Sequence, residues 1–191
     1  MISLVKGQNV NLSKENPGLS KITVGLGWDA KKVAGGQDFD LDACAFMIGE
    51  NGKVRQDSDF IFYNQLKSPC TSVEHSGDNR TGSGDGDDEQ IKVDLSKIPA
   101  DVHRVIFCVS IHEGGERRQN FGQVKNAYVR IINATDGKDL ARYDLTEDAS
   151  VETAMKFAEL YRNNGEWKFK ALGEGTRGGL LVLAKDNGVA V

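Results

Sequence analysis

The sequence predicts an all-β fold, a β-sandwich of two antiparallel sheets, with one helix near the C-terminus at about residues 150–163. The apolar segments are short and rich in Val, Ile and Phe, and Gly, Asn and Asp lie between them. Many short strands separated by turn residues are typical of sandwiches and barrels. The chain has 191 residues, of which 39% are hydrophobic, so we expect a single domain over residues 1–191.

Eight segments have the composition of strands. They are residues 22–28, 43–48, 59–64, 90–95, 104–111, 127–132, 167–172 and 179–184. Two of the intervening turns, at residues 49–53 and 134–138, contain Asn-Gly and Asp-Gly. These dipeptides favour tight hairpins, so neighbouring strands are expected to pair in antiparallel fashion.

The predicted helix rests on the spacing of apolar residues near the C-terminus. They are Val151, Ala154, Met155, Ala158 and Leu160. Their intervals are close to a helical turn, and Asn-Asn-Gly at residues 163–165 is a stop signal. We therefore expect a helix from about residue 150 to the turn at residue 163.

The charge balance limits the possible partners. With 24 basic and 28 acidic side chains and a formal net charge of −4, the chain offers no basic surface for nucleic acid or an anionic membrane. The longest apolar stretch, residues 180–184, is far below the roughly 20 residues that cross a bilayer, and residues 1–15 lack the apolar core of a signal peptide. We expect a cytoplasmic protein with no nucleic-acid partner and no direct membrane insertion.

The three cysteines, Cys44, Cys70 and Cys108, are odd in number and form no C-x-x-C pair. They predict neither a disulfide framework nor a thiolate zinc site. Cys44 and Cys108 lie in apolar strand-like runs, so we expect both to be buried. Cys70 follows Pro69 in a loop and is expected to react first with a thiol reagent.

An acidic, glycine-rich segment covers residues 77–90. It holds five carboxylates against the single Arg80, with four glycines between them. The carboxylates belong to Asp78, Asp85, Asp87, Asp88 and Glu89. Like charges this close repel, and ordering a glycine-rich backbone costs entropy. A bound cation would offset both costs; otherwise the segment is a solvated loop.

A second acidic cluster, Asp38, Asp40 and Asp42, alternates with apolar residues. On a strand, the three carboxylates would share one face while the apolar residues between them anchor the strand in the core. One alternative is a polar strand end that faces water. Another is that Asp38 precedes the strand in a turn, so that all three acids crowd one site.

These donors favour calcium. Carboxylates, Asn amides and backbone carbonyls are hard oxygen ligands, and the glycines at 82, 84 and 86 allow carbonyls to turn inward. The three histidines, His75, His103 and His112, are widely separated in sequence, which argues against zinc or copper. Neither cluster has the spacing of an EF-hand loop.

The spacing of the first cluster predicts two calcium ions. In an extended strand, which rises about 3.3 Å per residue, the Cα atoms of Asp38 and Asp42 lie roughly 13 Å apart. Ligand bonds of about 2.4 Å cannot join both side chains to one ion. We expect Asp40 to be shared or central, and the 77–89 loop to complete the coordination.

Seven stretches, in order along nearly the whole chain, resemble the TerD family of tellurium-resistance and stress proteins. They are KGQNVNLSKENPGL, VGLGWDA, DFDLDA, FYNQLKSPC, GDNRTGSGDGDDE, QNFGQVKNAYVRI and GGLLVLAKDNGV. The resemblance implies a calcium-binding β-sandwich of bacterial cytoplasm that works with other tellurium-resistance proteins, including a membrane-bound partner.

The acidic motifs of that family fall on nine positions of this chain. They are Asp29, Asp38, Asp40, Asp42, Asp78, Asn79, Asp87, Asp88 and Glu89. The composition of the glycine-rich loop adds Asp85 and the backbone of Gly86. The eleven residues together are the predicted metal ligands.

Three function classes fit these observations. The first is a non-enzymatic calcium-binding module that assembles with partners. The second is a metal-dependent phosphoesterase-type hydrolase, because clustered carboxylates can hold catalytic ions about 4 Å apart. No His lies within either cluster, which argues against it. The third is thiol chemistry on tellurite, for which Cys70 is the plausible nucleophile. We favour the first class and expect no enzymatic activity.

Overall fold

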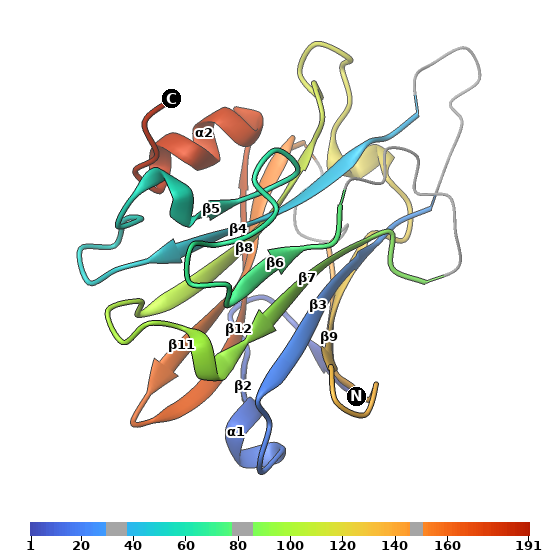
Figure 1. Cartoon of the computed structure of the whole chain (residues 1–191). Coiled ribbons are helices and arrows are strands. Elements are labelled where there is room, and N and C mark those ends of the chain that lie inside the picture. The colour runs from blue at the N-terminus through green and yellow to red at the C-terminus, as the bar shows by residue number, and fades with distance from the viewer. Residues whose placement is uncertain (30–37, 78–85, 146–150) are drawn as a thin grey trace.

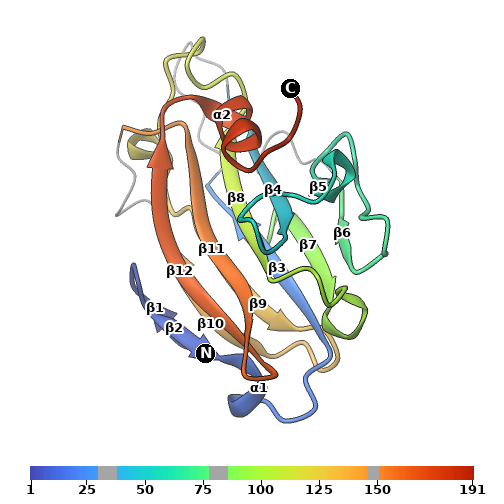
Figure 2. The same ribbon diagram turned by 90° about the vertical axis from the view of Figure 1, so that its left-hand side faces the viewer.

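The computed structural model of the chain describes residues 1–29, 38–77, 86–145 and 151–191. Two six-stranded sheets pack face to face (Figures 1 and 2). Sheet A contains, in order across it, β1 (Ile2–Leu4), β10 (Asp139–Asp144), β9 (Tyr128–Asn133), β3 (Lys21–Gly27), β7 (Glu89–Asp94) and β6 (Val73–His75). Sheet B contains β2 (Asn9–Asn11), β12 (Glu166–Thr176), β11 (Ala154–Asn163), β8 (Arg104–Ile111), β4 (Leu41–Ile48) and β5 (Phe60–Ile61).

The strand pairs are antiparallel except for β1 and β10, which are parallel. The predicted β-sandwich is therefore confirmed. Short helical elements connect or cover the strands. They are α1 (Leu12–Glu15), α2 (Gly179–Asp186) and the 3-10 turns η1 (Asp57–Asp59), η2 (Leu95–Lys97) and η3 (Phe121–Gln123). No helix among the described residues is long and apolar enough to cross a membrane.

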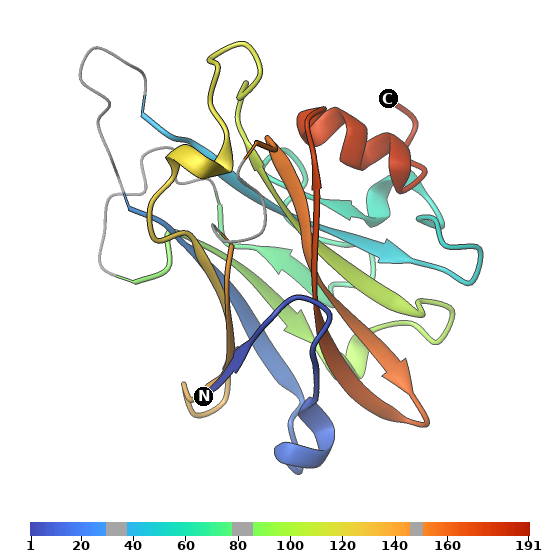
Figure 3. The ribbon, with the colours of Figure 1, turned by 180° about the vertical axis from the view of Figure 1, so that it is seen from behind.

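Buried side chains form two clusters, one on each face of sheet B. The main cluster fills the space between the sheets and includes Leu41, Ala43, Ala45 and Met47 of β4. Alternate β4 residues point the other way into a smaller cluster, which Leu183 and Ala184 of α2 cover. Figure 3 shows α2 beside the end of β12 on this outer face. Both faces of β4 are thus buried, which explains its continuous apolar sequence.

The helix predicted at residues 150–163 is wrong, because residues 154–163 form strand β11. The cause is a β-bulge. The pairing with β8 runs Lys156 to Cys108 and then Ala158 to Phe107, so that Phe157 is an extra residue. Phe157 and Ala158 both face the main core. The bulge breaks the two-residue period and produces apolar intervals that resemble those of a helix.

A second difference lies at residues 179–184, which were predicted to be a strand and form most of α2. A short, continuous apolar run fits a buried strand and a buried helix equally well. Asn187 ends α2, and its buried side-chain amide donates to the Leu183 carbonyl at 2.7 Å. The segment predicted at 59–64 shrinks to the two residues of β5. The other predicted strands are present, and both hairpin turns contain a glycine with positive φ, Gly52 and Gly137.

The cysteines lie as expected. Cys44 of β4 and Cys108 of β8 are fully buried, whereas Cys70 is only partly buried. Burial raises the pKa of the Cys44 thiol well above its usual value, and a hydrogen bond with Cys108 raises it further. Burial also acts to raise the pKa of Cys70, but hydrogen bonds with the hydroxyls of Ser68 and Ser72 outweigh it and lower that pKa overall.

Candidate metal site

The predicted ligands that the structure describes lie where β3 and β8 end and β4 and β7 begin, at the upper right of Figure 1. We call this end of the sandwich the acidic end. Its described members are Asp29, Asp38, Asp40, Asp42, Gly86, Asp87, Asp88 and Glu89. Asp78, Asn79 and Asp85, also predicted as ligands, lie outside the described residues. The two acidic clusters meet here because β7 pairs with β3 in sheet A while Glu89 reaches β4 in sheet B.

Glu89 connects the two sheets. Its carboxylate is fully buried and accepts a 2.6 Å hydrogen bond from the backbone N–H of Ala43. His75 Nε2 lies 3.4 Å from the same carboxylate and 3.0 Å from the Ala43 carbonyl. Because the Gly77 N–H donates to His75 Nδ1, the Nε2 atom carries the proton of the neutral ring. Donors of the chain itself therefore hold Glu89.

Asp87 is held on the outer side of sheet A. Its Oδ1 lies 2.7 Å from Nε of Arg130, and its Oδ2 accepts from Nη2 of the same guanidinium at 3.2 Å. Gln90 donates to the Oδ2 atom at 3.1 Å. The carboxylate lies so close to Gly25 that a Cβ added there would meet Oδ2 at 2.1 Å, which explains the glycine in β3. Asp87 is a bidentate ion-pair partner within the fold.

Asp88, between these two residues, has backbone contacts with Leu26 and Trp28. Its Oδ2 accepts from the Trp28 N–H at 3.0 Å, and its own N–H donates to the Leu26 carbonyl at 2.8 Å. Partial burial raises the pKa of Asp88; the Trp28 hydrogen bond opposes this effect, and the charges of Asp87 and Glu89 add to it. Asp88 therefore carries its charge in a region of negative potential.

The first cluster differs from the predicted row of three strand residues. Phe39, Leu41 and Ala43 anchor the segment in the main core as expected. Asp38 and Asp40, however, precede β4, and only Asp42 lies on it. The alternation nevertheless continues before β4, because Phe39 shares the main core with Leu41 and Ala43, and the Asp40 carbonyl accepts a hydrogen bond from the His112 N–H. The separation of about 13 Å between Asp38 and Asp42 stays a prediction.

The remaining predicted ligands lie near the surface. Asp29 is exposed, its N–H donates to the Lys125 carbonyl at 3.0 Å, and its Oδ2 accepts from Asn126 Nδ2 at 2.7 Å. The Gly86 carbonyl accepts a 3.0 Å hydrogen bond from the Tyr128 hydroxyl. Gly86 has a φ of 102°, a conformation that glycine adopts without strain.

Two histidines accompany the acidic clusters, contrary to the expectation from sequence. His75 lies beside Glu89, and His112 Nδ1 lies 3.6 Å from Asp42 Oδ2. The His112 N–H also donates to the Asp40 carbonyl at 2.8 Å. His112 is 70 residues from Asp42 in sequence, and His75 lies on β6, 14 residues before Glu89 of the neighbouring strand β7. Strand pairing and loop packing bring each histidine to its carboxylate.

A cavity of about 350 Å³ opens beside His112. Asp42, Ser110 and His112 line one side of it, and Arg177 and the first residues of α2 line the other. The Ser110 hydroxyl is buried and has no hydrogen-bond partner among the described residues. Across residues 1–29, 38–77, 86–145 and 151–191, no three His, Cys, Asp or Glu side chains form a group that could hold a metal ion.

A model of the TerD domain matches residues 1–186 of the chain. The chain belongs to the TerD family. It is 57% identical over 188 residues to the tellurium resistance protein TerD of Serratia marcescens, covering 98% of this chain and 97% of that protein. It is 56% identical over 190 residues to general stress protein 16U of Bacillus subtilis (strain 168), covering 100% of this chain and 98% of that protein.

The fold agrees with solved TerD-family structures. A homologue of telluride resistance protein (TerD) from Streptomyces coelicolor A3(2) superposes with a TM-score of 0.73 at 25% sequence identity, covering 87% of this chain and 96% of that one. The resemblance drawn from the sequence motifs is thus confirmed. The family is named for resistance and stress response rather than for an enzymatic reaction.

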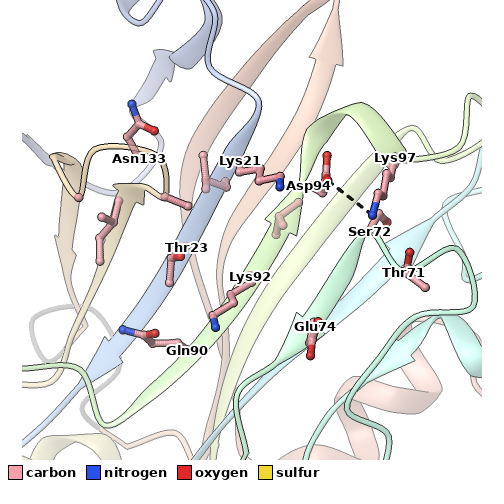
Figure 4. Close-up of a pocket in the computed structure, with 15 residues that line it drawn as sticks. Lys21, Thr23, Thr71, Ser72, Glu74, Gln90, Lys92, Asp94, Lys97 and Asn133 are labelled. Carbon is pink, nitrogen blue, oxygen red and sulfur yellow. Dashed lines mark ion pairs between the residues drawn. The ribbon is translucent and has the colours of Figure 1, made fainter.

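A second hollow, of about 550 Å³, lies on the outer face of sheet A of this TerD-family chain. Figure 4 shows Lys21, Lys92 and Lys97 around it, with Thr23 and Gln90 beside Lys92. Asp94 lies 3.8 Å from Lys97 in the same hollow. None of the described acids that were predicted as metal ligands lines it.

Proposed function

We propose that the chain is a non-enzymatic, calcium-binding protein of tellurite resistance and general stress response. Its acidic end binds about two Ca²⁺ ions and supports assembly with partner proteins. The names of the Serratia and Bacillus relatives support the resistance and stress roles. The meeting of two separate acidic clusters at one end of the sandwich supports the calcium site, because their oxygen donors suit this ion.

The contacts at the acidic end separate the eleven predicted ligands into residues that position the backbone and residues assigned to calcium. Asp87 and Glu89 are engaged by Arg130 and by the Ala43 N–H, so we assign them to positioning the segment that carries Asp88. The donors assigned to calcium are then Asp29, Asp38, Asp40, Asp42 and Asp88, with Asp78, Asn79, Asp85 and the Gly86 backbone from the glycine-rich loop. Bound calcium supplies the positive charge that this set lacks.

The expected partners are other tellurium-resistance proteins, including a membrane-bound one, and the expected location is the cytoplasm. Calcium that orders the acidic end would fix the surface presented to these partners. A pull-down from the source bacterium, with calcium and with a chelator, tests this part. Recovery of the same partners in both conditions would contradict a calcium-dependent assembly.

Calorimetric titration tests the calcium site. We expect a stoichiometry near two for calcium, weaker binding of magnesium, and a lower stoichiometry after Asp40→Asn. Asp136→Asn is the matched control, because Asp136 lies in the exposed hairpin turn at 134–138 and its Oδ1 only accepts from the Lys138 N–H. A stoichiometry near one for the wild type would reject the two-ion arrangement, and no heat of binding would reject the calcium site.

A second candidate function is a metal-dependent phosphoesterase. The observation that favours it is the cavity that holds His112 and Asp42 together with Arg177, since a histidine, a carboxylate and a guanidinium can serve phosphate-ester hydrolysis. A screen of phosphoesters with Mn²⁺ or Mg²⁺ separates the two functions. Turnover that His112→Ala abolishes would favour the hydrolase.

A further inference from the structure

Cys44 and Cys108 face each other across two neighbouring strands. β4 and β8 are antiparallel, and their register places Cys44 directly opposite Cys108. Both side chains point to the outer face of sheet B, where they share one cluster with Phe46 and Ile106. The proximity of Cys108 also contributes to the raised pKa of the Cys44 thiol, after the larger effect of burial. The fold therefore holds a dithiol in a fixed mutual arrangement.

The spacing of such a pair suits a covalent bond. Residues directly opposite on antiparallel strands have Cα atoms about 4.5 or 5.5 Å apart, according to their hydrogen-bond pattern. Disulfides join Cα atoms about 4.4 to 6.8 Å apart. A disulfide between Cys44 and Cys108 can thus close by rotation of the side chains while the strands stay paired.

Helix α2 shields the pair from solvent. Both cysteines are 0% exposed, and Leu183 and Ala184 of α2 belong to the cluster that buries them. The helix packs on β8 and β11, as Figure 3 shows for its position on sheet B. Because Val54 and Phe60 belong to the same cluster, α2 is one of the elements that cover the thiols, and its movement away from the sheet is the opening that we consider.

The cavity beside His112 leads toward the same place. The next residue pair on this face of β4 and β8 is Asp42 and Ser110, which lie opposite each other. Both line the cavity, and residues 178–181 at the start of α2 form another wall. Two residues along a strand span about 6.6 Å, so solvent at the start of α2 is one residue pair from the thiols.

We propose that Cys44 and Cys108 are a redox-responsive dithiol, which a hydroperoxide oxidises to a cross-strand disulfide when α2 lifts from sheet B. Once exposed, one thiol loses its proton, and the thiolate attacks a peroxide oxygen, which becomes the oxygen of a sulfenic acid. The O–O bond breaks, and the other oxygen takes up a proton and leaves as an alcohol or water. The second sulfur then attacks the sulfenic sulfur and releases water. In sum, two thiols lose two hydrogens and the peroxide is reduced. This inference is independent of calcium binding.

The test uses the full chain with Cys70→Ser, because Cys70 is partly exposed and would react first. The protein is treated with hydrogen peroxide, quenched and alkylated, and the linked peptides are identified by mass spectrometry without reduction. We expect a Cys44–Cys108 link that a reductant reverses. Cys44→Ser should instead leave an unlinked Cys108 that a sulfenic-acid reagent traps.

Two leucines of α2 supply matched variants for the gating step. Leu183 is 1% exposed and Leu181 is 53% exposed, so Leu183→Ala loosens the docking of α2 while Leu181→Ala makes the same change on the solvent side. We expect linkage to be about tenfold or more faster in Leu183→Ala and unchanged in Leu181→Ala. Equal rates in the two variants would overturn the gating by α2.

The proposed disulfide would be rejected if peroxide produced only sulfinic or sulfonic acids and no bond between Cys44 and Cys108. If Leu183→Ala does not fold, the wild-type rate is measured in increasing urea below the unfolding transition. A rate that rises in this range supports local lifting of α2, because local opening precedes global unfolding. A rate that stays constant until the whole chain unfolds overturns it.

Discussion

Asp87 and Glu89 flank Asp88 in sequence, but the fold treats the three acids differently. Asp87 lies on the outer side of sheet A in a bidentate pair with Arg130, and Glu89 lies between the sheets against the Ala43 N–H. Asp88 accepts a hydrogen bond from the Trp28 N–H and has two like charges beside it. The three consecutive acids therefore do not form one site. Asp87 and Glu89 make contacts within the fold, and Asp88 between them is the candidate metal ligand.

The start of β7 explains this division. Strand pairing begins at Glu89, so Glu89 follows the inward alternation of Ile91 and Val93. Asp87 precedes the strand and is not bound by that alternation. The chain can turn at Gly86, whose φ is 102°, and direct Asp87 to the opposite side of the sheet.

The largest effect is expected for Glu89→Ala measured with a chelator. The change leaves the Ala43 N–H and His75 without the carboxylate that they share, inside the space between the sheets. We expect the free energy of unfolding to fall by about 3–5 kcal/mol. Urea unfolding measures it, with Glu89→Gln as a control that keeps an acceptor oxygen and loses less. Wild-type stability of Glu89→Ala in chelator would contradict the structural role.

A smaller loss is expected for Asp87→Ala, which removes two charged hydrogen bonds from Arg130. In this variant Arg130 still has an ion-pair partner, Asp139, at 3.1 Å. We therefore expect the free energy of unfolding, measured in urea, to fall by about 1.5–3 kcal/mol. Asp139→Ala is the matched control and should cost about 1 kcal/mol or less, since Asp139 is more exposed. Equal losses in the two variants would contradict the distinction between a buried and an exposed partner of Arg130.

Asp88→Asn should act on the calcium response. In chelator, the melting temperature should remain close to that of the wild type, because the backbone contact with Trp28 is available to an amide oxygen as well. Millimolar calcium should raise the melting temperature of the wild type by mass action and raise that of the variant less. An undiminished calcium response in Asp88→Asn would remove Asp88 from the ligand set.

The smallest effect is a pH dependence. The pKa of Asp88 is raised, chiefly by burial, so its charge in the folded state costs stability above the folded-state pKa. This cost disappears as the pH falls through that pKa. Without calcium, the wild type should therefore gain stability relative to Asp88→Asn on acidification. Thermal unfolding of both proteins at a series of pH values measures this difference. If the wild type instead lost stability relative to Asp88→Asn on acidification, the pKa of Asp88 would be lowered rather than raised.

The sequence predicted the sandwich and its inner layer well, because strands with one or two buried faces have distinctive composition. Phe39, Leu41 and Ala43 were correctly expected in the core, and Cys44 and Cys108 were correctly expected to be buried. These predictions depend only on local alternation and hydrophobicity.

Features that depend on long-range pairing were not predicted. The bulge at Phe157 exists only in the pairing of β11 with β8 and β12, so its apolar spacing looked helical. Likewise His75 and His112 reach the acidic clusters because sheet pairing and loop packing bring them there. For the candidate site, the sequence supplied the acids but not which of them the fold already uses.

Strands β1 and β2 pair with strands that lie far from them in sequence, which affects the order in which the protein folds during synthesis. β1 pairs with β10 in sheet A, Ile2 lying opposite Ala141, while β2 pairs with β12 in sheet B, Asn11 lying opposite Lys168. A ribosome adds about 5–20 residues per second, so β1 and β2 leave the ribosome well before their partners β10 and β12 are synthesised. The N-terminal edge is therefore completed late, and nascent chains stalled before residue 166 should leave β2 accessible to proteases and chaperones.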